Sequence, residues 1–137
     1  MSHLPPAPGF EPHFRRSGLT DPWEPLFSKR LPGAVYLGLW AGEAHANSRQ
    51  LVHGGLLTAL ADNAMGLSCV QANDEPIVPV TVNLTVDFVA AAHLGEWIEV
   101  RPTVIKSSRN LSFVSAVVTA NDRICARANA IFKGMPK

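Results

Sequence analysis

The sequence predicts an α+β fold in which a curved antiparallel sheet wraps around one long central helix. Residues 53–70 are rich in Ala and Leu and carry apolar side chains on nearly all sides, which is typical of a helix buried over most of its surface. From residue 81 onward, four segments alternate apolar and polar residues and are separated by turn residues, which predicts strands. The length of 137 residues fits one domain.

The first 30 residues are expected to form a proline-rich arm beside a single domain that spans residues 31–137. Six of the eleven prolines lie within residues 1–25, and this density excludes a long helix or a central strand. The arm is either loose or packed over the domain, and Trp23, Leu26 and Phe27 are candidates for fixing its end.

The domain is expected to begin with a strand at residues 34–40, followed by a hairpin partner at 42–47 and a polar loop at 47–50. The central helix then begins at His53 and ends before the turn-forming segment 74–76. Later strands at 81–89, 96–105, 111–120 and 123–132 are separated by turns at 94–95, 107–110 and 121–122. We expect these four strands to form a meander.

Composition excludes several classes of function. Twelve Lys and Arg against eleven Asp and Glu give a net charge of +1, and no basic segment indicates a nucleic acid or an anionic membrane as partner. The longest apolar stretch, residues 54–70, is interrupted by polar residues and is a poor membrane span. Residues 1–6 do not resemble a signal peptide, so we expect a cytoplasmic protein. Cys69 and Cys125 form no metal-binding spacing, and no metal site is predicted.

Asp62 is the only formally charged residue between residues 54 and 70. A carboxylate on a buried helix must be paired, face a cleft or be held protonated. Helical spacing places Thr58 and either Met65 or Gly66 on the same face. The residue alone leaves a catalytic and a structural role equally open.

The start of the helix, His53-Gly54-Gly55, is a second candidate site. Two glycines let a substrate approach the backbone closely, and free N–H groups at the positive end of the helix dipole can stabilise an oxyanion. Glycines chosen only for tight packing would give the same pattern. Asn47 lies six residues before His53, where its amide can reach the same cleft, although loop asparagines often serve only as turn formers.

The combination is more specific than its parts. Asn47, the His53-Gly54-Gly55 helix start, Asp62 and the strands that follow resemble the hotdog-fold acyl-CoA thioesterases, in particular the PaaI-like and 4-hydroxybenzoyl-CoA thioesterase type. The resemblance extends from about residue 34 to residue 132 and leaves only the arm outside. It implies a hotdog fold, an acyl-CoA substrate, no cofactor, and a homodimer at minimum, with a homotetramer expected.

The resemblance also implies roles for individual residues. The Gly54 N–H would polarise the thioester carbonyl, assisted by the side chains of His53 and Asn47. Asp62 of the other subunit would act as nucleophile or general base, and Thr81 would orient the attacking water. Other relatives place that hydroxyl four residues after the carboxylate, and this position is a glycine here.

Four residues are expected to bind substrate, namely Gly55, Met65, Gly66 and Arg109. Lys106 and Arg127 are further basic candidates for the phosphates of CoA. One departure from the relatives is Gln50, which stands where they often have glycine.

Two rival functions share this fold. A hotdog enoyl-CoA hydratase would carry an Asp shortly before the histidine, but residues 47–52 contain no carboxylate. A non-catalytic module that binds and senses acyl-CoA would have no need of Asp62, so retention of the helix carboxylate favours an enzyme.

Overall fold

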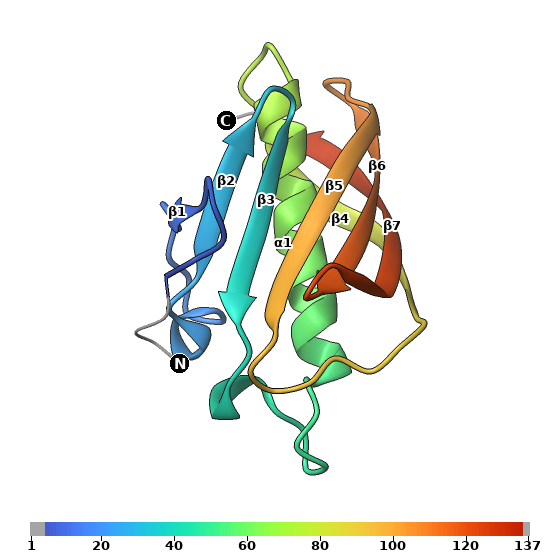
Figure 1. The fold of residues 1–137 in the computed structure, drawn as a ribbon. Coiled ribbons are helices and arrows are strands. Elements are labelled where there is room, and N and C mark those ends of the chain that lie inside the picture. Colours follow the sequence, from blue (N-terminus) through green and yellow to red (C-terminus); the bar gives the residue numbers. More distant parts are fainter. Residues whose placement is uncertain (1–4, 136–137) are drawn as a thin grey trace.

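The computed structural model describes residues 5–135, in which a seven-stranded antiparallel sheet curves around a single long helix, α1 (Gly54–Ala72) (Figure 1). The described range does not include residues 1–4 and 136–137. Residues 1–4 are part of the segment on which the expectation of a cytoplasmic protein rests. The strands are β1 (Glu11–Pro12), β2 (Phe27–Leu31), β3 (Ala34–Trp40), β4 (Val78–Phe88), β5 (Trp97–Lys106), β6 (Leu111–Ala120) and β7 (Arg123–Met135). Two short 3₁₀ helices, η1 (Asp21–Trp23) and η2 (Glu43–His45), complete the elements.

The predicted helix is confirmed, and it lies in the hollow of the sheet. Its buried residues are Leu56, Leu57, Leu60, Ala61, Ala64, Met65, Gly66, Ser68 and Cys69. The buried hydroxyl of Ser68 accepts a hydrogen bond from the backbone N–H of Val35 on β3 at 2.9 Å. This bond ties the C-terminal half of α1 to the beginning of β3.

The strand order is β1-β2-β3-β5-β6-β7-β4. β5, β6 and β7 form the predicted meander, and the tight turn at Asn121–Asp122 has both residues at positive φ, as a two-residue hairpin requires. The expected place of β4 in that meander is wrong, because β4 pairs with β7 at the far edge. There Leu84 and Val86 of β4 pack towards the core.

The N-terminal half differs from the prediction at two points. β3 forms a hairpin with β2, not with residues 42–47, which contain η2. The connecting residue Gly33 has φ +75°, a left-handed conformation that favours glycine. β2 also crosses the predicted boundary between arm and domain at residues 30 and 31, so the end of the arm is a strand of the sheet.

The beginning of the described arm, residues 5–10, packs over the outer face of the sheet. Phe10 lies edge-on to Trp97 of β5 with ring centroids 5.2 Å apart, and the indole N–H of Trp40 donates to the carbonyl of Pro5. The indole of Trp97 lies so close to Gly38 of β3 that a Cβ there would overlap it. The arm is therefore held by an aromatic cluster that requires glycine, which has no side chain, at position 38.

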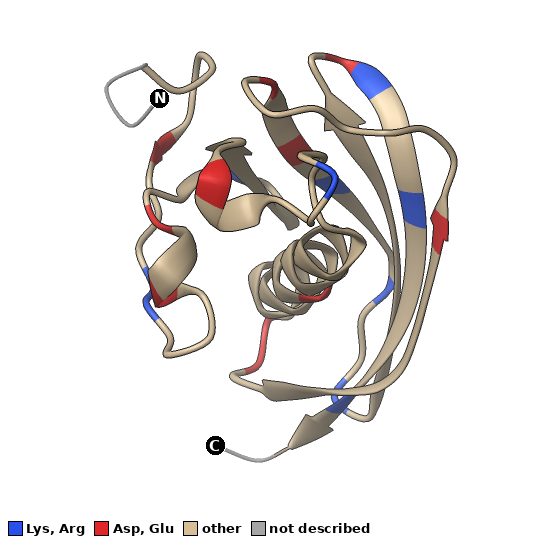
Figure 2. Ribbon diagram, turned by 90° about the horizontal axis from the view of Figure 1, so that it is seen from below, with Lys and Arg blue, Asp and Glu red and all other residues tan. Residues whose placement is uncertain are grey.

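Viewed along α1, the sheet lies on one side of the helix and the N-terminal segment on the other (Figure 2). Basic and acidic residues are spread over many elements (Figure 2). Within residues 5–135 no helix has the length and apolar character needed to cross a membrane.

Candidate functional site

The start of α1 leaves one backbone N–H group free. The first four N–H groups of a helix have no partner inside it. Here the side chain of His53 accepts from the Gly55 N–H at 2.8 Å, and the carbonyl of His53 accepts from Leu56 and Leu57. The Gly54 N–H is left without a hydrogen-bond partner among residues 5–135. This N–H, at the positive end of the helix, is the donor that an oxyanion site requires.

Gly54 lies in the wall of a cavity of about 380 Å³. The cavity is lined by Asn47, Leu51, Val52, Gly54, Leu57, Phe88, Val89, Ala90, Ala91 and Ala92. The side-chain oxygen of Asn47 accepts from the N–H groups of Arg49 and Leu51, at 2.8 and 3.1 Å. These bonds fix the orientation of the amide and leave its NH₂ group available as a second donor. The structure thus brings the predicted pair Asn47 and Gly54 together.

Asp62 is paired with a residue far away in sequence. The hydroxyl of Thr81 on β4 donates to Asp62 Oδ1 at 2.7 Å, which leaves Oδ2 free to accept a proton. Both residues line a cavity of about 240 Å³ together with Arg15, Gly66 and Phe132 among others. The prediction that Thr81 belongs to the same site as Asp62 is consistent with this contact.

Within one chain, the two halves of the predicted site are separate. Gly54 and Asp62 line different cavities, and a separation of eight positions corresponds to about 12 Å along a helix. A reacting carbonyl must lie within about 3 Å of both the oxyanion donors and the attacking group. One chain therefore does not assemble the complete constellation.

His53 and Gly55 line a different cavity from Asn47 and Gly54. They line a third cavity of about 440 Å³ beside the N-terminal segment. The Nδ1 atom of His53 is occupied by the Gly55 N–H, so in this structure His53 caps the helix, and the backbone donor expected from Gly55 is already used. The hydroxyl of Thr58 donates to the Gly54 carbonyl at 2.8 Å and fixes the same turn.

The remaining predicted binding residues are dispersed. Met65 is fully buried in the core and lines none of these three cavities. Gly66 lies beside Asp62, where an added Cβ would lie 3.4 Å from the Phe132 ring. Arg109 is an exposed residue that pairs with Glu75 at 3.6 Å, away from both cavities that hold the polar groups.

Two features were not predicted. Arg15 of the arm lines the Asp62 cavity, and Phe88 at the end of β4 covers Gly54. Gln50 has φ +63°, a left-handed conformation that glycine adopts more readily than glutamine. Burial raises the pKa of the Cys69 thiol to about 11, and a thiol that stays protonated at neutral pH is a poor nucleophile.

Comparison with known proteins shows the family. The family model described as "Thioesterase superfamily" matches residues 50–126, which include the helix start, Asp62 and Thr81. The Pseudomonas aeruginosa protein named "Putative esterase PA0474" is 35% identical over 125 residues, covering 90% of this chain and 93% of that protein. Human "Acyl-coenzyme A thioesterase 13" is 36% identical over 90 residues, covering 64% of this chain and 62% of that protein.

Solved structures have the same fold. The phenylacetic acid degradation protein PaaI from Thermus thermophilus, in a mutant form, superposes with a TM-score of 0.72 at 22% identity, over 80% of this chain and 93% of that one. A Streptococcus mutans protein bound to acetyl CoA gives a TM-score of 0.78 at 19% identity, over 91% and 96%. The family match, the fold and the helix-start geometry agree: this chain belongs to the thioesterase superfamily and is a hotdog-fold thioester hydrolase.

Proposed function

We propose that this protein hydrolyses acyl-CoA thioesters at a site built from two copies of the chain. One copy provides the Gly54 N–H and the Asn47 amide, and the other provides Asp62 with Thr81. One observation carries the proposal. The Gly54 N–H at the helix start is free, the Asp62 carboxylate accepts a hydrogen bond from Thr81, and the two groups lie too far apart within one chain to act on the same carbonyl. The name of the human relative and the acetyl CoA bound to the streptococcal structure support the substrate class.

The arrangement fits thioester hydrolysis. Asp62 Oδ2 accepts a proton from a water molecule, and the water oxygen attacks the thioester carbonyl carbon. Charge develops on the carbonyl oxygen, where the Gly54 N–H and the Asn47 NH₂ group donate to it. The tetrahedral intermediate collapses, the C–S bond breaks, and the proton on Asp62 passes to the departing CoA sulfur. If Asp62 instead attacks as nucleophile, an acyl-enzyme anhydride forms first and hydroxylamine traps it.

An exposed edge strand supports a homodimer. β4 is the last strand of the sheet, and only β7 pairs with it among the described residues. Val78, Val80 and Val82 on this strand are each at least 42% exposed. Unpaired apolar edges of this kind associate readily with another strand. Pairing of β4 with β4 of a second copy would continue the sheet and bring the two helices side by side.

The first test is release of CoA thiol from a panel of aryl, arylacetyl and straight-chain acyl-CoAs. Asp62→Asn keeps the shape and removes the base, so kcat should fall by at least about 100-fold. Turnover that survives this change would exclude Asp62 as catalyst. Binding of acyl-CoA without turnover on the whole panel would favour a sensing module instead.

A mixing experiment tests whether the site is shared. Asp62→Asn and Asn47→Asp chains are each expected to be inactive as homodimers. In a mixed dimer, one site carries both changes and the other carries neither. Random exchange after partial unfolding produces mixed dimers in about half of the population, so about a quarter of wild-type activity should return. A mixture that stays inactive despite demonstrated exchange would contradict the shared site.

A further inference from the structure

The N-terminal segment and the start of α1 enclose the third cavity, which the proposed mechanism does not use. Its volume is about 440 Å³, within the range of small-molecule sites. Its walls are mainly apolar and aromatic, and they comprise Leu19, Trp23, Ala44, His45, Ala46, His53, Gly55, Leu56 and Ala59. A cavity of this size and composition is suited to an uncharged hydrocarbon group.

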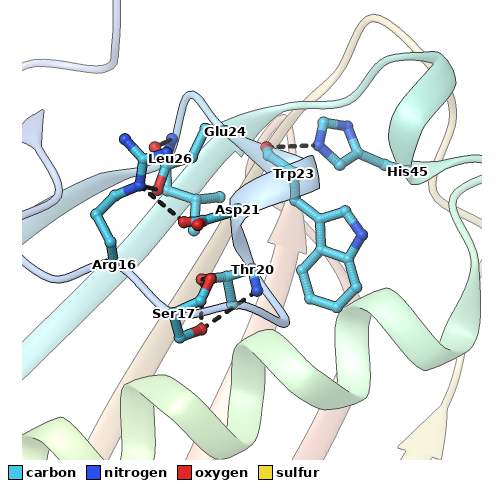
Figure 3. A network of polar contacts seen from close by, with 8 residues as sticks. All are labelled: Arg16, Ser17, Thr20, Asp21, Trp23, Glu24, Leu26 and His45. Atoms are coloured by element: carbon cyan, nitrogen blue, oxygen red, sulfur yellow. Dashed lines mark hydrogen bonds and ion pairs between the residues drawn. The ribbon is translucent and has the colours of Figure 1, made fainter.

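One wall belongs to the arm loop, which we define as residues 15–23. Leu19 in this loop is 68% exposed, although a leucine beside an apolar cavity would normally bury more of its surface. Trp23 is partly buried against the core, and its indole points towards α1 (Figure 3). These two side chains present apolar surface to the cavity that the protein itself does not cover.

The arm loop is fixed by a dense set of polar contacts (Figure 3). The buried side chain of His45 accepts from the Gly42 N–H through Nδ1, so its Nε2–H donates to the Trp23 carbonyl at 3.0 Å. Arg16 donates to Asp21 at 2.9 Å, and the hydroxyls of Ser17 and Thr20 lie 2.8 Å apart. A loop held in this way presents Leu19 and Trp23 in one place, which a preformed binding wall requires.

The start of α1 borders both this cavity and the Asn47 cavity. Gly54 lines the Asn47 cavity, while its neighbours His53 and Gly55 line the cavity beside the arm loop. A thioester carbonyl held at the Gly54 N–H has two substituents, the pantetheine sulfur and the acyl group. The more apolar surroundings beside the arm loop suit the acyl group, and the Asn47 cavity is then free for the pantetheine arm.

The arm loop also extends towards the carboxylate. Gly55, Ala59 and Asp62 follow one another at helical spacing along one face of α1. Leu19 and Trp23 lie at the His53 end of this face, and Arg15 lines the cavity of Asp62. The arm loop therefore borders α1 from the helix start, where this chain would hold the thioester carbonyl, to the Asp62 that the chain would provide to the site of the other copy.

We infer that the arm loop is the specificity wall of the acyl pocket, and that Leu19 and Trp23 select apolar acyl groups larger than acetyl. The inference rests on the proposed function, because the thioester is placed by the Gly54 N–H. Leu19 and Trp23 are substrate-contacting residues in this arrangement, with no part in the chemical step.

Binding measurements test the inference without turnover. Calorimetry compares CoA with its S-hexyl thioether, which cannot be hydrolysed, on the intact protein. Leu19→Ala should weaken binding of the thioether about tenfold, the lower range for lost apolar contacts in a pocket, and should leave CoA affinity unchanged. Trp23→Leu should act in the same direction. The matched control is Phe14→Ala in the same arm, because the Phe14 ring packs beneath the guanidinium of Arg30 instead.

Kinetics give a second, independent readout. For hexanoyl-CoA, Leu19→Ala should raise KM about tenfold with little change in kcat, which is the signature of lost uniform binding. Equal affinity of wild type and both variants for the thioether would overturn the inference, even if hydrolysis is confirmed. Thioether binding that depends on Leu19 in a protein without turnover would reject the proposed reaction and keep the acyl pocket. Circular dichroism confirms that each variant is folded.

Discussion

Replacement of Thr81 by valine isolates the contribution of one hydrogen bond to catalysis. Valine has nearly the same shape and suits a strand, but it cannot donate to Asp62. Hydrogen bonds to charged groups contribute about 1.5–3 kcal/mol. Since Thr81 is exposed, we take the lower end, about 1.5 kcal/mol, which corresponds to roughly a tenfold fall in kcat. The fold should be unaffected, because no buried group loses its partner.

The assay is steady-state release of CoA from the best acyl-CoA of the panel. Thr81→Ser keeps the donor and should retain most activity. Thr85→Val is the matched control, since Thr85 is an exposed threonine on the same strand, four residues further on. Combining Thr81→Val with Asp62→Asn should cause little further loss, because the base that Thr81 orients is already gone. Wild-type kcat in Thr81→Val would refute a catalytic role for this contact.

Further predictions concern the donor amide, the core and a buried thiol. Asn47→Asp keeps the oxygen that accepts from Arg49 and Leu51 but replaces the NH₂ donor, so kcat should fall by about 10²–10³ with little change in Tm; unchanged kcat would exclude the amide as an oxyanion donor. Ser68→Ala removes the acceptor of the Val35 N–H and should lower the free energy of unfolding by about 1–3 kcal/mol in urea titrations, and an unchanged midpoint would contradict this. Burial raises the pKa of Cys69 from 9.0 to about 11 in the folded protein, so its thiol has no effect on stability below pH 9 and lowers it as pH rises from 9 towards 11. Urea titrations on either side of pH 9 should show a shallower pH dependence for Cys69→Ala, whereas an identical dependence would show that another group is responsible.

The sequence predicts local structure better than strand order in this protein. The helix at residues 54–72 is visible from its Ala- and Leu-rich composition, and the strands of the meander are visible from their alternating pattern and turn residues. β2 was missed because Lys29 and Arg30 interrupt the apolar pattern and prolines surround the segment. The place of β4 beside β7 depends on a connection between distant segments, and no local signal encodes that choice.

The sequence predicts which residue types form the candidate site better than it predicts which of them share a cavity. Asn47, Gly54 and Asp62 stand out by their positions around a buried helix, and Thr81 does lie beside Asp62. Sequence spacing does not encode the direction of a side chain at a helix start. His53 therefore caps the helix through Gly55 and lines a cavity other than that of Asn47 and Gly54. The same limit explains Met65, which the helix turns into the core.

The overlap between Gly38 and Trp97 has a consequence for how this protein can change during evolution. A single added carbon at position 38 removes the space that the indole occupies, and loss of the indole removes the surface on which Phe10 rests. Mutations at these two positions can therefore be accepted only in a compensating order, with the tryptophan shrinking before the glycine grows. Alignments of relatives should show glycine at position 38 wherever position 97 is tryptophan. We therefore expect Phe10, Trp97 and Gly38 to be inherited together.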